Sequence, residues 1–222
     1  MFKSINSESV AEIIEKKSKF IATLCEANSK DEAEKILQET RKKYHDAKHN
    51  CYAYIVEEAK LAGGTNEHES SNQVTDKIVQ KIEKCSDDGE PSGTAGAPML
   101  ALLKSANLTN VIIIVTRYFG GILLGTGGLV RAYTESAQKA IENAQIVQKD
   151  YGIRYEVEIA YSDLKNIQFI CKNLKINIVK MEYKENIKLI LESTLDAKKE
   201  LERANISLIS INEICHKIIT QN

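Results

Sequence analysis

The stretch from Val111 to Ala144 places the strongest constraint on how this 222-residue chain folds. It opens with five consecutive β-branched residues, Val111 to Val115, without the alternation of apolar and polar positions that a half-exposed strand shows. Such a run suits a strand that is covered on both faces, so we expect it at the centre of a sheet. A glycine-rich turn follows, and small or apolar residues then recur every three or four positions up to Ala144. This spacing predicts an amphipathic helix that packs on the strand before it.

The turn between this strand and this helix holds five glycines between positions 120 and 128. Glycine loses more backbone entropy on folding than other residues, so this density indicates a need for positive φ angles or close backbone approach. A helix N-terminus offers unpaired N–H groups, and an arginine flanks the turn on each side, so we interpret the turn as a phosphate cradle. The alternative is a tight connection that uses glycines only for packing. The residues of this cradle are Arg117, Gly120, Gly121, Gly125, Thr126, Gly127, Gly128 and Arg131.

The glycine turn matches neither of the two common nucleotide-binding patterns. No Gly-Lys-Ser/Thr follows it, as a Walker A motif requires. Val130 stands where the last glycine of a Gly-x-Gly-x-x-Gly motif would be. A nucleotide-dependent enzyme of either type is therefore not expected.

A second loop, from Ser86 to Pro98, combines carboxylates with hydroxyls and glycines. Its carboxylates suit Mg²⁺ bound through water, and its hydroxyl and backbone N–H groups suit a phosphate. The alternative is an acidic turn that its own side chains cap. If the two loops meet at one edge of the sheet, the carboxylates and the arginines hold one another around an anion. The candidate metal ligands are Asp87, Asp88 and Glu90, and the candidate phosphate contacts are Ser92 and Thr94.

Charge, hydropathy and cysteine usage exclude several classes of protein. With a net charge of −1, the chain as a whole does not attract nucleic acid electrostatically. Any surface that binds nucleic acid must therefore be a local basic patch. The sequence shows neither a signal peptide nor an apolar stretch of membrane-spanning length, so we expect a cytoplasmic protein that does not engage membranes. Five scattered cysteines, an odd number, indicate reduced core residues. His45, His49 and Cys51 lack a fourth ligand for zinc, so we interpret His49 as a polar site residue or a structural histidine.

The sequence pattern changes near Lys149. From Asp150 onward, strand and helix patterns follow the order β-α-β-β-α-β, which is that of the ferredoxin-like split unit. We therefore predict an α+β protein with two domains, residues 1–149 and 150–222. Between Glu57 and Asp76 the chain is polar and aperiodic, which predicts a surface loop that proteases cut first.

Four motifs carry a resemblance to a known family. They are Lys19-Phe20-Ile21, the segment from His49 to Tyr54, the loop from Ser86 to Gly96 and the stretch from Thr116 to Tyr133. On these motifs the chain resembles the IMPACT/YigZ family in its bacterial two-domain form. The resemblance implies an N-terminal domain of the ribosomal-protein "second domain" type and a C-terminal domain like the last domain of a translocation elongation factor. It also implies a link to translation, because the eukaryotic relatives are regulators of translation.

Two hypotheses for function come from different classes of protein. In the first, the chain is a cytoplasmic regulator that binds RNA or the ribosome through phosphates at the glycine turn, with no catalytic residue and no cofactor, and its C-terminal domain offers a surface for a protein partner. In the second, the chain is a Mg²⁺-assisted phosphoester-cleaving enzyme that uses Asp87, Asp88 and Glu90. We favour the first, mainly because of the family resemblance and with the phosphate cradle as local support, and a purely structural scaffold is the remaining alternative. The residues expected to extend the phosphate-binding surface are Lys16, Lys17, Lys19, Lys48 and His49.

Overall fold

The computed structural model describes residues 1–60, 78–194, 197–204, 206 and 208–220. These residues form two compact units, Phe2–Val147 and Gln148–Asn222 together with Met1. Each unit contains antiparallel strands, helices and an apolar core of its own. The fold class is therefore α+β, as the sequence predicts.

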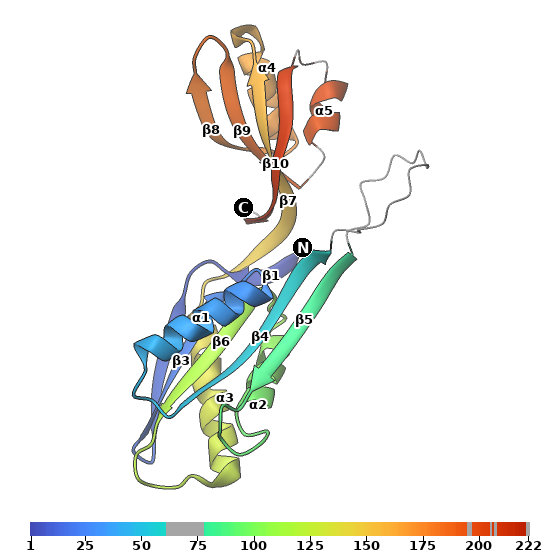
Figure 1. The fold of residues 1–222 in the computed structure, drawn as a ribbon. Coiled ribbons are helices and arrows are strands. Elements are labelled where there is room, and N and C mark those ends of the chain that lie inside the picture. Colours follow the sequence, from blue (N-terminus) through green and yellow to red (C-terminus); the bar gives the residue numbers. More distant parts are fainter. Residues whose placement is uncertain (61–77, 195–196, 205, 207, 221–222) are drawn as a thin grey trace. The chain divides into compact units, whose positions relative to one another are not determined.

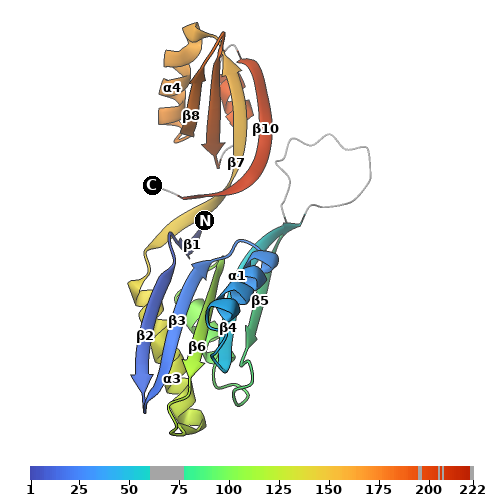
Figure 2. The same cartoon turned by 60° about the vertical axis from the view of Figure 1, so that its left-hand side comes forward.

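The strands of the first unit are β1 (Phe2–Ile5), β2 (Ser9–Glu15), β3 (Ser18–Glu26), β4 (His49–Lys60), β5 (Ile78–Ser86) and β6 (Val111–Tyr118). The strands β2 to β6 form an antiparallel sheet with the order β2-β3-β6-β4-β5 (Figures 1 and 2). The central strand is β6, and its residues from Val111 to Arg117 are all buried. The predicted position of the β-branched run at the centre of a sheet is confirmed.

The helices α1 (Lys30–Lys43), α2 (Gly96–Ser105) and α3 (Gly125–Asn143) cover this sheet, with α1 on one face and α2 and α3 on the other (Figures 1 and 2). Ile112 and Ile114 of β6 belong to the apolar cluster that contains Leu37 of α1. Ile113 and Val115 belong to the opposite cluster, which contains residues of α2 and α3. Because successive side chains of a strand point to opposite faces, coverage of both faces explains why the run contains no polar residue.

Side-chain caps fix the beginning of α1. Oγ of Ser29 accepts a hydrogen bond from the N–H of Glu32 at 3.1 Å, and the Glu32 carboxylate accepts one from the N–H of Asn28 at 2.8 Å. The spacing of Ser29 and Glu32 predicts this capping box, although the carboxylate reaches one residue further back than expected. The last turn of α1 carries Arg41, which reaches the loop that follows β5.

The second unit contains β7 (Ile146–Ile159), the short 3₁₀ helix η1 (Tyr161–Asp163), α4 (Leu164–Asn173), β8 (Asn177–Tyr183), β9 (Ile187–Ser193), α5 (Ala197–Arg203) and β10 (Leu208–Thr220). Its strands pair in the antiparallel order β8-β9-β7-β10. The core joins Val157, Ile167, Leu189 and Leu201 from the strands and both α-helices. The elements follow the β-α-β-β-α-β order that the sequence predicts.

One predicted loop and one strand differ from what the sequence predicts, and most of that loop lies outside the residues that the structure describes. The predicted loop from Glu57 to Asp76 begins too early, because β4 continues to Lys60, and its remaining residues lie outside the described part of the chain. The strand β1 was not predicted. In the described residues, Cys25, Cys51, Cys85 and Cys171 are free thiols, and none of the helices is long and apolar enough to cross a membrane.

Candidate functional site

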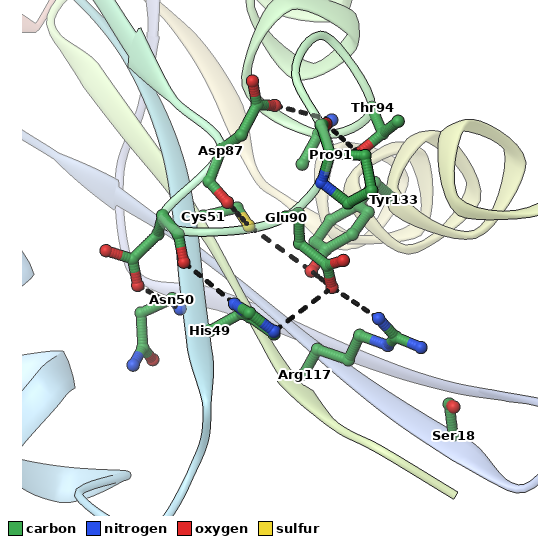
Figure 3. Close-up of polar contacts among 12 residues, drawn as sticks. Ser18, His49, Asn50, Cys51, Asp87, Glu90, Pro91, Thr94, Arg117 and Tyr133 are labelled. Atoms are coloured by element: carbon green, nitrogen blue, oxygen red, sulfur yellow. Dashed lines mark hydrogen bonds and ion pairs between the residues drawn. The ribbon is translucent and has the colours of Figure 1, made fainter. Parts of the chain in front are cut away.

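A buried carboxylate, that of Glu90, lies at the centre of a polar cluster between the two predicted loops (Figure 3). Its Oε1 accepts hydrogen bonds from Nη1 of Arg117 at 2.5 Å and from the hydroxyl of Tyr133 at 2.9 Å. Nε2 of His49 lies 4.0 Å from the same oxygen. The loop after β5 supplies the carboxylate, β6 supplies the arginine and α3 supplies the tyrosine. The two loops therefore meet, and Glu90 of the first pairs with Arg117, which lies at the end of β6 just before the second.

The guanidinium group of Arg117 is held by aromatic rings as well as by this carboxylate. Its central carbon lies 5.5 Å from the ring centroid of Phe20 and 5.6 Å from that of Phe119, within the range in which ring quadrupoles attract a cation. The Arg117 side chain is only 7% exposed. Among the described residues its buried Nε finds no hydrogen-bond partner, which leaves one donor of the guanidinium group unused.

Asp88 ties the first loop to α1 and to the beginning of β4. Its Oδ1 accepts a hydrogen bond from Arg41 at 2.5 Å, and its Oδ2 accepts one from the N–H of Asn50 at 2.7 Å. Nδ1 of His49 lies 2.9 Å from the carbonyl oxygen of Asp88. A carbonyl oxygen only accepts, so Nδ1 carries the proton and Nε2 is the nitrogen that faces Glu90.

Asp87 holds the backbone of its own loop. Its Oδ1 accepts hydrogen bonds from the N–H groups of Ala95 at 2.9 Å and Gly96 at 2.8 Å, and its Oδ2 accepts one from Gly93 at 2.8 Å. Burial raises the pKa of the Asp87 carboxyl, but these hydrogen bonds together outweigh burial and place the pKa below its ordinary value. The N–H groups expected to bind a phosphate in this loop are therefore occupied by the chain's own carboxylate.

The three candidate metal ligands do not converge on one point. Asp87 accepts backbone N–H groups, Asp88 accepts from Arg41, and Glu90 accepts from Arg117. Within the described ranges, the structure contains no group of three His, Cys, Asp or Glu residues placed to hold a metal ion. The geometry gives no support to the Mg²⁺ site that the spacing of these carboxylates favours.

The glycines of the second loop provide both close backbone approach and positive φ angles, the two features that the sequence predicts. A Cβ atom on Gly120 would lie 2.0 Å from the carbonyl carbon of Lys17 in the β2–β3 turn, so only glycine fits there. The N–H of Gly120 also donates to Oγ of Ser18 at 3.1 Å. Gly121 and Gly125 have φ angles of +84° and +73°, a region that favours glycine.

The first turn of α3 has no side-chain cap. Leu124 precedes the helix and forms no capping hydrogen bond, and the turn contains no acidic residue. Gly125 and Thr126, at its start, are exposed. The first N–H groups of the helix therefore keep their partial positive charge at an accessible surface.

A pocket of about 400 Å³ lies between this helix start and the Glu90 cluster. Both polar and apolar residues line the pocket, and two of the apolar ones are well exposed, Phe119 at 53% and Leu123 at 82%. Lys48 is exposed and forms no ion pair with any residue that the structure describes. The residues that line the pocket are Lys48, His49, Glu90, Pro91, Arg117, Phe119, Leu123, Leu124, Gly125, Thr126 and Leu129.

Several predicted site residues lie outside this pocket. Lys19 pairs with Glu12 at 2.7 Å, and the hydroxyl of Thr94 donates to the carbonyl of Pro91 at 2.6 Å. Arg131 is exposed on α3 and, within the described part of the chain, forms neither a hydrogen bond nor an ion pair. The predicted site residues that do not line the pocket are Lys19, Asp87, Asp88, Ser92, Thr94, Gly120, Gly121, Gly127, Gly128 and Arg131.

Sequence reasoning missed the roles of Tyr133 and Phe119. Tyr133 lies on the buried face of α3, where the helical period predicts only a core role, yet its hydroxyl joins Glu90 to the thiol of Cys51, which lies 3.3 Å away. A buried tyrosine hydroxyl requires a polar partner, so a tyrosine on the apolar face of a predicted helix is the sequence feature that indicates such a role. No periodicity marks Phe119, because it lies in an irregular loop.

Comparison with known proteins identifies the family. Residues 16–141 match the family model described as the Impact N-terminal domain, and every residue of the pocket lies within this match. The chain belongs to the IMPACT family. The resemblance seen in the four sequence motifs is therefore confirmed.

Relatives of similar length exist in bacteria. IMPACT family member YvyE of Bacillus subtilis is 35% identical over 176 residues, which are 79% of this chain and 72% of that protein. IMPACT family member YigZ of Escherichia coli is 30% identical over 89% of this chain and 92% of that protein. A crystal structure of a hypothetical protein aligns with a TM-score of 0.56 at 28% identity, and it covers 95% of this chain and 97% of that one. The similarity to these IMPACT proteins extends over most of the chain.

Proposed function

We propose that this chain is a cytoplasmic, translation-associated regulatory protein that binds RNA, free or within the ribosome, through the pocket between Glu90 and the start of α3. One observation carries the proposal. The uncapped N-terminus of α3, the unpaired Lys48 and the buried Arg117 all line one pocket. This combination of a helix N-terminus, a lysine and an arginine suits a phosphate group.

The apolar residues of the pocket favour RNA over inorganic phosphate as the ligand. Phe119 and Leu123 are exposed and line the same pocket as Lys48 and Arg117, so a ligand that fills the pocket needs an anionic part and a flat or apolar part. A nucleotide in single-stranded RNA has both, because its unstacked base can lie on an aromatic side chain while its phosphate meets cations. Lys17 of the β2–β3 turn lies next to Gly120, and with its exposed neighbour Lys16 it extends the basic surface.

The link to translation rests on family membership. The IMPACT resemblance implies regulation of translation, and RNA is the chemical component of the ribosome that the pocket suits. We further infer that the first unit has the ribosomal-protein "second domain" fold and that the second has the ferredoxin-like fold of an elongation factor's last domain. The β-α-β-β-α-β order and the β8-β9-β7-β10 pairing support the second assignment.

A charge placed at the start of α3 tests the proposal. In Thr126→Glu, the new carboxylate favours the helix dipole, so the fold is preserved, but it repels a phosphate in the pocket. We expect the affinity for a short single-stranded RNA, measured by fluorescence anisotropy, to fall about tenfold or more. Thr126→Gln has the same shape without the charge and is the matched control, which should bind nearly as the parent does. Equal affinities of the Glu and Gln variants would refute the pocket as the RNA site.

A further inference from the structure

The outer face of α4 carries an exposed aromatic residue between two lysines. Phe169 is 66% exposed, which is unusual for a phenylalanine. Lys165 precedes it by four positions and Lys172 follows it by three, so the three side chains share one face of the helix. The opposite face packs into the core through Ile167 and Cys171. Phe169 is therefore not needed to attach α4 to the sheet.

This face is a local cationic patch in a chain without net positive charge. Residues 164–181 contain four lysines and no aspartate or glutamate, while the whole chain has a net charge of −1. Lys165 and Lys172 are exposed, and neither forms an ion pair within the described part of the chain. By contrast Lys180, on β8, pairs with Glu182 at 2.5 Å. The unpaired lysines on α4 are available to an anionic partner.

The surroundings of Phe169 favour a nucleic acid over a protein as that partner. Its neighbours one turn away on the same face are Lys165, Asn166, Lys172 and Asn173, all of them polar and exposed. The core of a protein interface gathers apolar residues and is depleted of lysine, so a single phenylalanine between lysines is a poor match. Single-stranded nucleic acid is bound by aromatic side chains that stack on bases and by cations that follow the backbone, which is the composition of this face.

We propose that α4 is a second binding surface for single-stranded RNA, in which a base stacks on Phe169 while Lys165 and Lys172 contact the phosphates on either side. The choice of RNA rests on the function proposed for the pocket. The surface itself is a separate one, on the other unit of the chain, and is tested separately.

The test compares variants of the full chain for binding to a short unstructured RNA. Phe169→Ala should lower the affinity roughly tenfold, since loss of one aromatic stacking platform has an effect of that order. Phe169→Tyr should restore it, whereas Phe169→Leu, which keeps an apolar side chain without a ring, should not. Lys165→Gln and Lys172→Gln should each reduce the slope of log affinity against log salt by about 0.7. Lys198→Gln, an exposed lysine on α5, is the matched control and should leave both quantities unchanged.

The outcomes separate this surface from the pocket. Parental RNA affinity in Phe169→Ala overturns the inference, and so does an affinity of Phe169→Leu equal to that of the parent, because stacking would then play no part. If Thr126→Glu weakens RNA binding and Phe169→Ala does not, the pocket function stands and the α4 surface falls. If only Phe169→Ala weakens it, the α4 surface stands and the pocket falls. None of these substitutions at exposed positions should lower the melting temperature, so a loss of affinity is not a loss of fold.

Discussion

Nη1 of Arg117 lies 2.5 Å from Oε1 of Glu90, and these two side chains are only 7% and 4% exposed. Breaking a buried ion pair leaves an uncompensated charge in the interior, which is far more costly than losing a surface pair. We expect Arg117→Ala to lower the free energy of unfolding by about 3 to 5 kcal/mol, measured by urea denaturation. Arg41→Ala breaks the more exposed pair with Asp88 and should cost about 1 kcal/mol or less. Intact stability of Arg117→Ala with lost RNA affinity would show instead that this arginine serves the ligand alone.

The pH dependence of stability should reveal the role of Asp87. Hydrogen bonds from Gly93, Ala95 and Gly96 keep the pKa of its carboxyl below the ordinary value despite burial. A group whose pKa is depressed by folding stabilises the native state fully above its unfolded pKa, and this contribution is lost as the pH falls through the folded pKa. We expect Asp87→Asn to lower the free energy of unfolding by roughly 1 to 3 kcal/mol at pH 7.

The same variant should differ less from the parent in acid. Unfolding curves at a series of pH values from neutral to below the ordinary aspartate pKa should show the difference shrinking as the parent's carboxyl is protonated. Asp31→Asn, at an exposed position in the first turn of α1, is a suitable control for a carboxylate without such backbone bonds. A difference that stayed constant with pH would argue against a charged Asp87 as the origin of the effect.

The sequence was most informative where local periodicity and tertiary packing agree. The run from Val111 to Val115 contains no polar residue, and only burial on both faces of a sheet permits this. The glycines at positions 120, 121 and 125 indicated close approach or positive φ, and both occur. The meeting of the two loops followed from their complementary charges once both were placed at one edge of the sheet.

Side-chain direction within the loops could not be predicted from spacing. Asp87, Asp88 and Glu90 fall within four residues, yet their carboxylates reach different partners, because an irregular backbone has no fixed period. Helix geometry explains why Arg131 does not line the pocket. Gly125 and Leu129 are four residues apart on α3 and both line the pocket, whereas Arg131 is two positions further on and must lie on another side of the helix.

Two glycines of the same turn should respond to alanine in opposite directions. A Cβ on Gly120 would lie 2.0 Å from the backbone of Lys17, so Gly120→Ala forces the β2–β3 turn to move and should cost roughly 1 to 3 kcal/mol. Gly127 is in the first turn of α3 with nothing within 4 Å of its Cβ position, so Gly127→Ala should stabilise the chain by about 0.5 to 1 kcal/mol. Thermal unfolding of both variants checks the pair. A stabilised Gly120→Ala would mean that the turn does not pack as the structure shows.

The first unit should fold without the second. Its two apolar clusters use residues between Ile5 and Ile141, and the cluster of the second unit uses residues from Tyr155 onward. A fragment of residues 1–149 should therefore show one cooperative thermal transition by circular dichroism. A fragment of residues 1–124 lacks α3, and with it Tyr133 and Ala137 of the larger cluster, so it should show none. Absence of cooperativity in the longer fragment would contradict two independent folding units.

The ring and the hydroxyl of Tyr133 have separate roles. The ring contacts Phe20 edge-on at a centroid distance of 5.2 Å, and the hydroxyl bonds to Glu90 and Cys51. Burial raises the pKa of the Tyr133 hydroxyl well above its ordinary value, so it donates to the carboxylate throughout the neutral range. In Tyr133→Phe the ring packing remains, and Glu90 keeps Arg117 as its partner.

We therefore expect Tyr133→Phe to cost only about 1 kcal/mol in urea denaturation, the usual net value of one hydrogen bond. Tyr133→Ala removes the ring as well and should cost about 3 to 5 kcal/mol, because it leaves a cavity in the core. Cys51 keeps its hydrogen bond to the carbonyl of Asp87 at 3.0 Å, and burial raises the pKa of its thiol to about 12, so it should resist alkylation at pH 8 in the parent and in Tyr133→Phe alike. Rapid alkylation of the Phe variant would show that the hydroxyl, rather than the packing of the ring, keeps this part of the core closed.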